Sequence, residues 1–203
     1  MNKKGDENRS VRNTKKKLRA VFLELLHEKP LNEITVRELT ELADVNRGTF
    51  YFHYSDIYDM LAKLENEFFA EFDEIVKSMV YGKENSAVSF INETFSCLSR
   101  NADLAGVLLG PHGDMDFVNR LKSLVFKKCS NIWQSINPHA DAERFDLFNG
   151  FIINGFIGLF ETWFSSGQKQ TPEEITAFAF TIIKGGLKES LAEEASSPKT
   201  GGK

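Results

Sequence analysis

The sequence lacks the motifs that mark most enzymes and metal-binding proteins. Its four histidines show no metal-ligand spacing such as HExxH, and there is neither a glycine-rich phosphate loop nor a GxSxG motif. We therefore expect no catalytic residues, no metal and no cofactor. His112 could belong to a site, although an ordinary loop position beside Pro111 and Gly113 explains it more simply.

Other absences limit the fold and the cellular location. The only cysteines are Cys97 and Cys129, and a pair of reduced thiols is favoured over a disulfide between them. No apolar stretch follows the basic N-terminus, so no signal peptide is visible and we expect a cytoplasmic protein. There is no internal repeat and no strand pattern, whereas apolar residues recur at helical spacing, which predicts an all-α fold.

The charges are unevenly distributed along the chain. The net charge of −4 alone argues against nucleic acid, yet residues 1–20 carry eight basic and only two acidic side chains. Residues 1–54 hold eleven basic against eight acidic residues, and the remainder holds fourteen against twenty-one. A basic N-terminal arm is typical of a DNA-binding protein, although a solubilising tail would show the same charge run.

Residues 35–54 form a pattern of two short helices joined by a tight turn. Thr35 and Glu38 match a capping box, which predicts a helix beginning at Val36. A turn at residues 44–46 leads into a second helix over residues 47–53. Such a pair, with a polar and exposed second helix, is typical of a DNA-reading helix-turn-helix.

The second of these helices is expected to bury one face and to present an unusual outward face. Phe50 and Tyr54, four residues apart, should point inward. The outward side chains are a cation, a hydroxyl and aromatic rings: Arg47, Thr49, Tyr51, Phe52 and His53. Gly48 costs about 1 kcal/mol relative to alanine inside a helix, which indicates that a backbone or a base edge comes close there.

This segment resembles the DNA-binding domain of the TetR family of bacterial repressors. The family pattern is a helix that begins at Thr, a turn that ends in Val-Ser, and then Gly-Thr-aromatic-Tyr-x-His-Phe. This chain reads VNRGTFYFHY over residues 45–54, with Asn46 at the usual Ser. Ile57 replaces the Lys that usually opens the next helix, so the phosphate contact of that Lys is not expected here.

The exposed face and the resemblance together predict the DNA contacts. Base edges are assigned to Arg47, Thr49 and Tyr51, and phosphates to Thr35 and His53. The whole predicted interface consists of Thr35, Asn46, Arg47, Gly48, Thr49, Tyr51, Phe52, His53, Lys15 and Lys17. The two lysines belong to a helix predicted over residues 11–28, whose basic first half opposes the helix dipole and so indicates an anionic partner. We expect the protein to be nucleoid-associated when it is bound to DNA.

Six further helices are predicted, for about nine in all. They cover residues 56–80, 86–98, 102–109, 115–136, 142–164 and 172–194. We divide the chain into a helix-turn-helix DNA-binding domain with its basic arm (1–54), a helical effector-binding and dimerisation domain (55–194) and a disordered tail (195–203).

The helix over residues 142–164 is the most apolar part of the chain. It is long enough to span a membrane, but Asp146, Asn149, Asn154 and Glu161 interrupt it, so a buried helix is favoured. Helices 142–164 and 172–194 offer more apolar surface than one core of this size needs. A two-fold dimer that packs them as a four-helix bundle would bury it, and the TetR resemblance implies the same.

The resemblance also implies a small-molecule site in the C-terminal body. No charged cluster there indicates a metal or a phosphorylated ligand, so a small apolar or aromatic effector is expected. Aromatic residues that could line the site, or could simply pack the core, are Phe90, Phe95, Phe117, Trp133, Phe151 and Phe156.

The sequence favours a homodimeric repressor that binds a double-stranded operator with two-fold symmetry and is released by an effector. The segments GVLLGPHGDMDF and GFIINGFIGLFETWF also resemble a TetR branch that includes a coactivator of dihydroxyacetone kinase genes. A coactivator or adaptor that acts through a protein partner is therefore the alternative. Ile57 and the acidic body favour this alternative, whereas the basic arm, Arg47 and the run at 48–51 favour the repressor.

Overall fold

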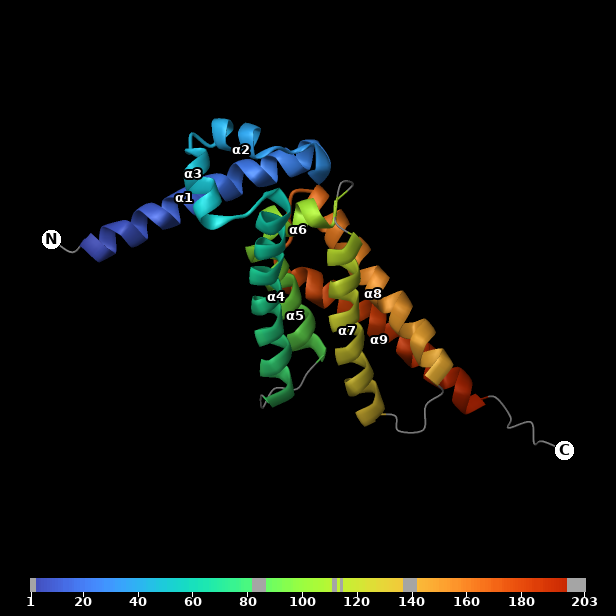
Figure 1. The fold of residues 1–203 in the computed structure, drawn as a ribbon. Helices are drawn as coiled ribbons and strands as arrows, with labels where there is room; N and C mark the ends of the chain where they lie inside the picture. The colour runs from blue at the N-terminus through green and yellow to red at the C-terminus, as the bar shows by residue number, and fades with distance from the viewer. Residues whose placement is uncertain (1–2, 82–86, 111–112, 114, 137–141, 197–203) are drawn as a thin grey trace. The chain divides into compact units, whose positions relative to one another are not determined.

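The computed structural model describes residues 3–81, 87–110, 113, 115–136 and 142–196, and these residues form helices without any strand (Figure 1). The α-helices are α1 (Lys3–Glu28), α2 (Val36–Leu42), α3 (Arg47–His53), α4 (Ile57–Tyr81), α5 (Ala87–Arg100), α6 (Ala102–Leu108), α7 (Met115–Ile136), α8 (Ala142–Ser165) and α9 (Pro172–Ser196). A 3₁₀ turn, η1 (Leu31–Glu33), precedes α2. The predicted all-α fold is confirmed for the described part of the chain. Most of the predicted tail, residues 197–203, lies outside it.

The helices gather into two compact units. The first unit comprises residues 1–73 and 101–124, and the second comprises residues 74–100 and 125–203. The boundaries fall inside α4 and inside α7, so these two helices each contribute to both units. The predicted helix-turn-helix lies wholly within the first unit.

The first unit is built on the apolar stripe of α1. Leu18, Phe22, Leu25 and Leu26 recur at helical spacing, and all four are buried as predicted. α1 begins at Lys3, however, well before the predicted start near Val11. The polar residues ahead of Val11 include no proline, so nothing in the sequence ends the helix there.

The earlier start of α1 corrects the dipole argument for its lysines. The electrostatic effect of the helix dipole falls off within the first turn. Lys15 and Lys17 lie roughly three to four turns beyond Lys3, in the middle of the helix rather than at its N-terminus. Their placement therefore carries no dipole penalty and, on that ground, no indication of an anionic partner.

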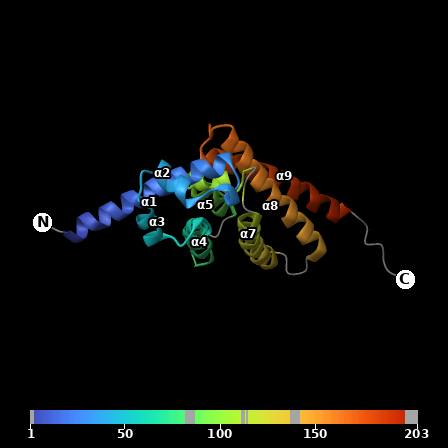
Figure 2. The same cartoon turned by 45° about the horizontal axis from the view of Figure 1, so that its top comes forward.

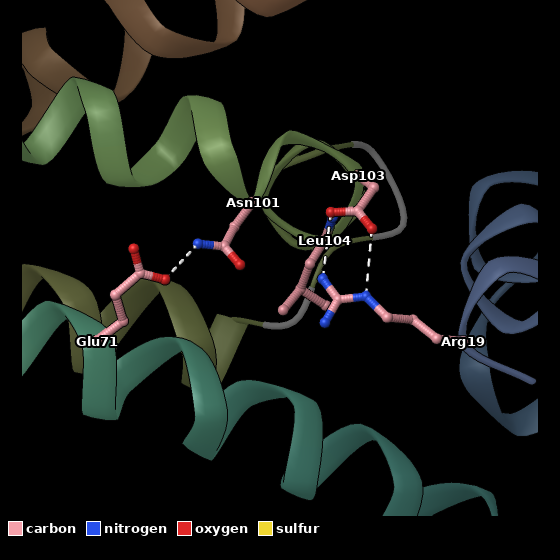
Figure 3. Close-up of polar contacts among 5 residues, drawn as sticks. All are labelled: Arg19, Glu71, Asn101, Asp103 and Leu104. Atoms are coloured by element: carbon pink, nitrogen blue, oxygen red, sulfur yellow. Dashed lines mark hydrogen bonds and ion pairs between the residues drawn. The ribbon is translucent and has the colours of Figure 1, made fainter. Parts of the chain in front are cut away.

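Polar contacts connect α6 to both α1 and α4 within the first unit (Figure 3). The Arg19 guanidinium in α1 donates to both carboxylate oxygens of Asp103 in α6, with both distances at 3.2 Å. The Asn101 amide donates to the Glu71 carboxylate in α4 at 2.9 Å. The start of α7 joins the same unit, because the Phe117 ring packs against those of Phe68 and Phe69.

The second unit is organised around α5, α8 and α9. α5 packs against α9, where the Thr176 hydroxyl lies 3.5 Å from Oδ1 of Asn92. α5 also packs against α8, because the Phe95 ring contacts Phe156 and Trp163 at centroid distances of 6.0 and 5.9 Å. α8 and α9 run side by side in both views of the molecule (Figures 1 and 2).

α8 has one buried face and one open face. Asn149, Ile153, Phe160 and Trp163 are buried at helical spacing. On the opposite face Leu147 and Phe151 are each 72% exposed, and a Cβ added at Gly150, Gly155 or Gly158 would meet no neighbour within 4 Å. By length and composition only, residues Asp146–Ser165 could cross a membrane, a test that the core helix of a soluble protein also passes.

Candidate nucleic-acid interface

The turn between α2 and α3 is fixed by local hydrogen bonds. Asp44 adopts the left-handed conformation with φ of 51°, which Asp tolerates better than most residues. The Val45 amide then donates to the Thr40 carbonyl at 3.0 Å, and half-buried Val45 closes the turn. The turn therefore ends directly before α3, as the sequence pattern predicted for residues 44–46.

Two of the predicted DNA-contact residues cap the helices. Thr35 Oγ1 accepts from the Glu38 amide at 3.2 Å, which begins α2, and Asn46 Oδ1 accepts from the Gly48 amide at 2.7 Å, which begins α3. Both side chains are exposed. Their donor groups, the Thr35 hydroxyl and the Asn46 amide NH₂, are not consumed by these caps and can donate to a phosphate.

Capping also gives a structural reason for Gly48. A Cβ at this position would lie 3.2 Å from Oδ1 of Asn46, closer than side chains usually approach. Glycine thus relieves crowding at the cap oxygen that holds its own amide. The close approach of a base edge predicted from the sequence remains compatible with this, because Gly48 is exposed.

The buried face of α3 sets the direction of its outward face. Phe50 is completely buried, Tyr54 is nearly so, and their ring centroids lie 5.5 Å apart. Helical geometry places Gly48 and Phe52 about 160° and 200° around the axis from Phe50. These two positions therefore mark the centre of the outward face.

The outward face keeps its predicted composition. Arg47, Tyr51 and Phe52 are exposed, while Thr49 and His53 are partly buried at its edges. An exposed face with two large rings and a guanidinium matches surfaces that bind a partner more closely than ordinary solvated helices. In chemical terms it can donate hydrogen bonds, attract anions and cover apolar groups.

The charge of Lys15 in α1 acts on His53 in α3. The pKa of His53 lies below its ordinary value of 6.5, because burial, then the charge of Lys15, then that of Lys63 disfavour the imidazolium. Lys17 is also exposed on α1. Lys15, a member of the predicted interface, therefore places positive charge at the edge of the α3 face where His53 lies.

Lys63 of α4 is a member of this edge that the sequence analysis missed. Its ammonium donates to the His53 carbonyl at 2.9 Å and to the Asp59 carboxylate at 2.8 Å, and it lies 5.4 Å from the centre of the Tyr54 ring. The only signal was its i, i+4 spacing from Asp59. Ile57, at the position of the family lysine, is buried and offers no charge.

Comparison with known proteins identifies the fold and the family. The sequence model described as bacterial regulatory proteins, tetR family, matches residues 20–64. A second model, described as a transcriptional regulator C-terminal region, matches residues 85–185. The chain belongs to the TetR family. It is thus a transcriptional regulator; regulators of this family bind operator DNA as dimers and also bind small-molecule ligands.

Solved structures of other TetR-family regulators share the fold at low sequence identity. NalD from Pseudomonas aeruginosa, the secondary repressor of the MexAB-OprM multidrug efflux pump, is 13% identical with a TM-score of 0.64, covering 87% of this chain and 97% of NalD. FadR from Bacillus subtilis, solved in complex with stearoyl-CoA, is 15% identical with a TM-score of 0.60, covering 82% of this chain and 96% of FadR. The dihydroxyacetone kinase operon activator DhaS is 13% identical with a TM-score of 0.53, covering 86% and 96%. No curated protein shows significant sequence similarity to the chain.

The structure disperses the six aromatic residues predicted to line an effector site. Phe90 and Phe95 are buried on α5, and Phe156 contacts Phe95. Phe117 instead packs in the first compact unit, and Phe151 points to solvent on the open face of α8. The side chain of Trp133 lies outside the described residues, as does that of Cys129. Periodicity could place these residues on apolar stripes, but it could not say which stripe stays open.

Among the described residues, no group of three or more His, Cys, Asp or Glu side chains is arranged to hold a metal ion. A guanidinium, hydroxyls and aromatic rings dominate the α3 face instead. These groups suit an anionic, hydrogen-bonding surface such as the edge of a DNA duplex.

Proposed function

We propose that this TetR-family regulator is a homodimeric repressor whose α3 enters the major groove of a two-fold symmetric operator and whose operator complex dissociates when an effector binds. In this assignment residues 1–54 bind DNA and residues 55–194 bind the effector and the second subunit. The observation that carries the proposal is the outward face of α3, which lies opposite the buried Phe50 and exposes Arg47, Tyr51 and Phe52.

Each residue of the interface receives a role from its chemistry. Arg47, Thr49 and Tyr51 suit base edges because they present donors at the exposed start and flank of α3. Thr35, Asn46 and His53 suit phosphates, since their donors lie at helix ends. Lys15 and Lys17 are exposed on α1 and attract the DNA phosphates whatever the base sequence. Lys63 adds a further positive charge near His53.

The test of this function is DNA binding by the purified protein alone. A short duplex from the region upstream of its own gene should be shifted at sub-micromolar concentration. Arg47→Ala should weaken binding by about 1–3 kcal/mol and relax sequence preference at one position, because a base contact is lost. Duplexes selected from a random pool by each variant measure that preference.

The matched control for Arg47→Ala is a double change of Lys15 and Lys17 to alanine. It should weaken binding to every sequence alike and flatten the dependence of affinity on salt, because only phosphate contacts are lost. Unchanged affinity and unchanged preference in Arg47→Ala would contradict the placement of α3 in the groove. A shift seen only after a second protein is added would contradict the repressor itself.

His53 makes the DNA affinity dependent on pH. In the free protein its pKa is lowered, first by burial and then by Lys15 and Lys63. A phosphate beside the ring raises that pKa, so binding takes up a proton. At fixed salt, affinity should therefore rise as the pH falls from about 8 to about 6. His53→Gln should flatten this dependence, and an identical profile in both proteins would exclude His53 as a phosphate ligand.

The dimer is proposed to form through the open faces of α8 and α9. Leu147 and Phe151 on α8, and Phe178 and Ile182 on α9, are exposed large apolar side chains on adjacent helices. Gly150, Gly155 and Gly158 leave open space beside the α8 pair, which permits a close helix approach. Two such helices from each subunit would form a four-helix interface.

The effector is proposed to be a small apolar or aromatic molecule held in the second unit. Phe95, Phe156 and Trp163 form its aromatic interior. The buried Asn149 amide nitrogen and the Thr94 hydroxyl have no hydrogen-bond partner among the described residues, so a polar group on the effector would be paired there. The related FadR was solved with stearoyl-CoA, a ligand that has both an apolar acyl chain and polar groups. Absence of thermal stabilisation by any aromatic or acyl compound in a screen would argue against such an effector.

A transcriptional activator that works through a protein partner is the second candidate. Two observations favour it: the similar fold of the dihydroxyacetone kinase operon activator DhaS, and the burial of Ile57 where the family usually has a lysine. In that case the α3 face would need the partner before it engaged DNA. The DNA-shift experiment described above separates the two candidates.

A further inference from the structure

Phe52 is an exposed apolar ring at the centre of the proposed DNA-reading face. At 79% exposure it is more accessible than any other large hydrophobic side chain in the described part of the chain. Its neighbours on the face, Arg47 and Tyr51, carry hydrogen-bonding groups, whereas Phe52 has none.

The fold gives no reason for this ring. Phe52 makes an edge contact with the His53 ring at a centroid distance of 5.0 Å, but most of its surface remains in water. It lies opposite Phe50, which already anchors α3 in the core. An apolar side chain that stays in water contributes no burial free energy to folding. We therefore expect Phe52 to be covered by another surface in a complex.

Gly48 leaves the ring accessible along the helix. Residues 48 and 52 lie one turn apart on the same face, and side chains of a helix lean toward its N-terminus. The position over which Phe52 leans therefore carries no side chain, because Gly48 has none. An apolar group on a base edge in the major groove could therefore contact one face of the Phe52 ring without displacing a side chain at position 48.

We propose that Phe52 reads a thymine by covering its C5-methyl group. This inference rests on the proposed function, since it requires α3 in the major groove. The thymine methyl is the apolar group that base edges present there, and every other base-edge feature is a hydrogen-bond donor or acceptor that a phenyl ring cannot match. Phe52 is then a specificity-determining residue that fixes one thymine in each half-site.

The experiment removes only the methyl group. Operator duplexes selected by the wild-type protein are remade with deoxyuridine in place of each thymine in turn, and affinities are measured by fluorescence anisotropy. One symmetry-related position should weaken wild-type binding by about fourfold per half-site and about fifteenfold when both are changed, as expected for one buried methyl group each. Phe52→Ala should bind the thymine and deoxyuridine duplexes equally.

Tyr58→Ala is the matched control, because Tyr58 is an exposed aromatic residue of α4 outside the α3 face. It should keep the wild-type discrimination between thymine and deoxyuridine. If Phe52→Ala also kept it, or if no deoxyuridine weakened the wild type, the thymine contact would be wrong and the ring would cover a sugar or a protein. If the wild type selected no duplex at all, the proposed function would fail and this inference with it.

Discussion

Phe151→Glu combined with Phe178→Glu should convert the regulator into a monomer. The two rings are 72% and 56% exposed on the adjacent helices α8 and α9, so the isolated chain has no need to bury them. In the proposed dimer they lie inside a dry interface, where four new carboxylates would be buried without partners. Desolvation of each charge costs several kcal/mol, which is enough to dissociate a micromolar dimer. Sedimentation analysis at micromolar concentration measures the change.

Loss of the dimer should also weaken operator binding by about a hundredfold or more, because two linked subunits would no longer bind the two half-sites simultaneously. Met115→Glu is the control, since Met115 is equally exposed but belongs to the start of α7 in the first unit. It should remain dimeric with wild-type affinity. A double variant that stayed dimeric would contradict the interface, and a monomer that kept full affinity would contradict the need for two half-sites.

The helix-turn-helix could be predicted closely because its signals are local. Thr35 and Asn46 mark helix starts by their side-chain oxygens, and the Phe50–Tyr54 spacing defines the buried face. Each of these features acts within four residues of sequence. A single chain segment therefore carries the information for these helices: α2 begins at the predicted Val36, and α3 has the predicted bounds Arg47–His53.

Local sequence signals did not predict the start of α1 or the role of Lys63. No apolar residue recurs at helical spacing ahead of Val11, so periodicity placed the start of α1 too late. Lys63 belongs to the proposed interface because the fold places α4 next to the end of α3. There the Lys63 ammonium donates a hydrogen bond to the His53 carbonyl. Such a contact arises from tertiary packing and leaves little trace in local sequence.

The aromatic residues of the body show a similar limit. Phe95, Phe117 and Phe151 all occupy apolar stripes of helices, and helical spacing alone assigns each of them to a buried face. The structure buries Phe95 among aromatic rings of the second unit, packs Phe117 in the first, and leaves Phe151 in water. Which stripe faces which neighbour is decided by the packing of whole helices, which single-residue patterns do not encode.

Phe50→Ala should cause the largest loss of stability in the DNA-binding part. The ring is fully buried, and it contacts Tyr51 and Tyr54 at centroid distances of 5.5 Å. Truncation removes its burial and leaves a cavity that the short helices α2 and α3 cannot fill, at a cost of about 3–5 kcal/mol. In a protein of this size that corresponds to a fall in melting temperature of about 10 °C, measurable by calorimetry.

Phe52→Ala, two residues away, separates packing from recognition. The same truncation is made on the same short helix, but the ring is exposed, so stability should change by no more than about 0.5–1 kcal/mol. Both variants should bind DNA less well: Phe50→Ala because α3 is no longer held, and Phe52→Ala because a contact is missing. Hydrogen exchange of the α2 and α3 amides should accelerate only in Phe50→Ala. Equal acceleration in both variants would show that Phe52 is part of the packing and that the face opposite Phe50 is not the free surface assigned to DNA.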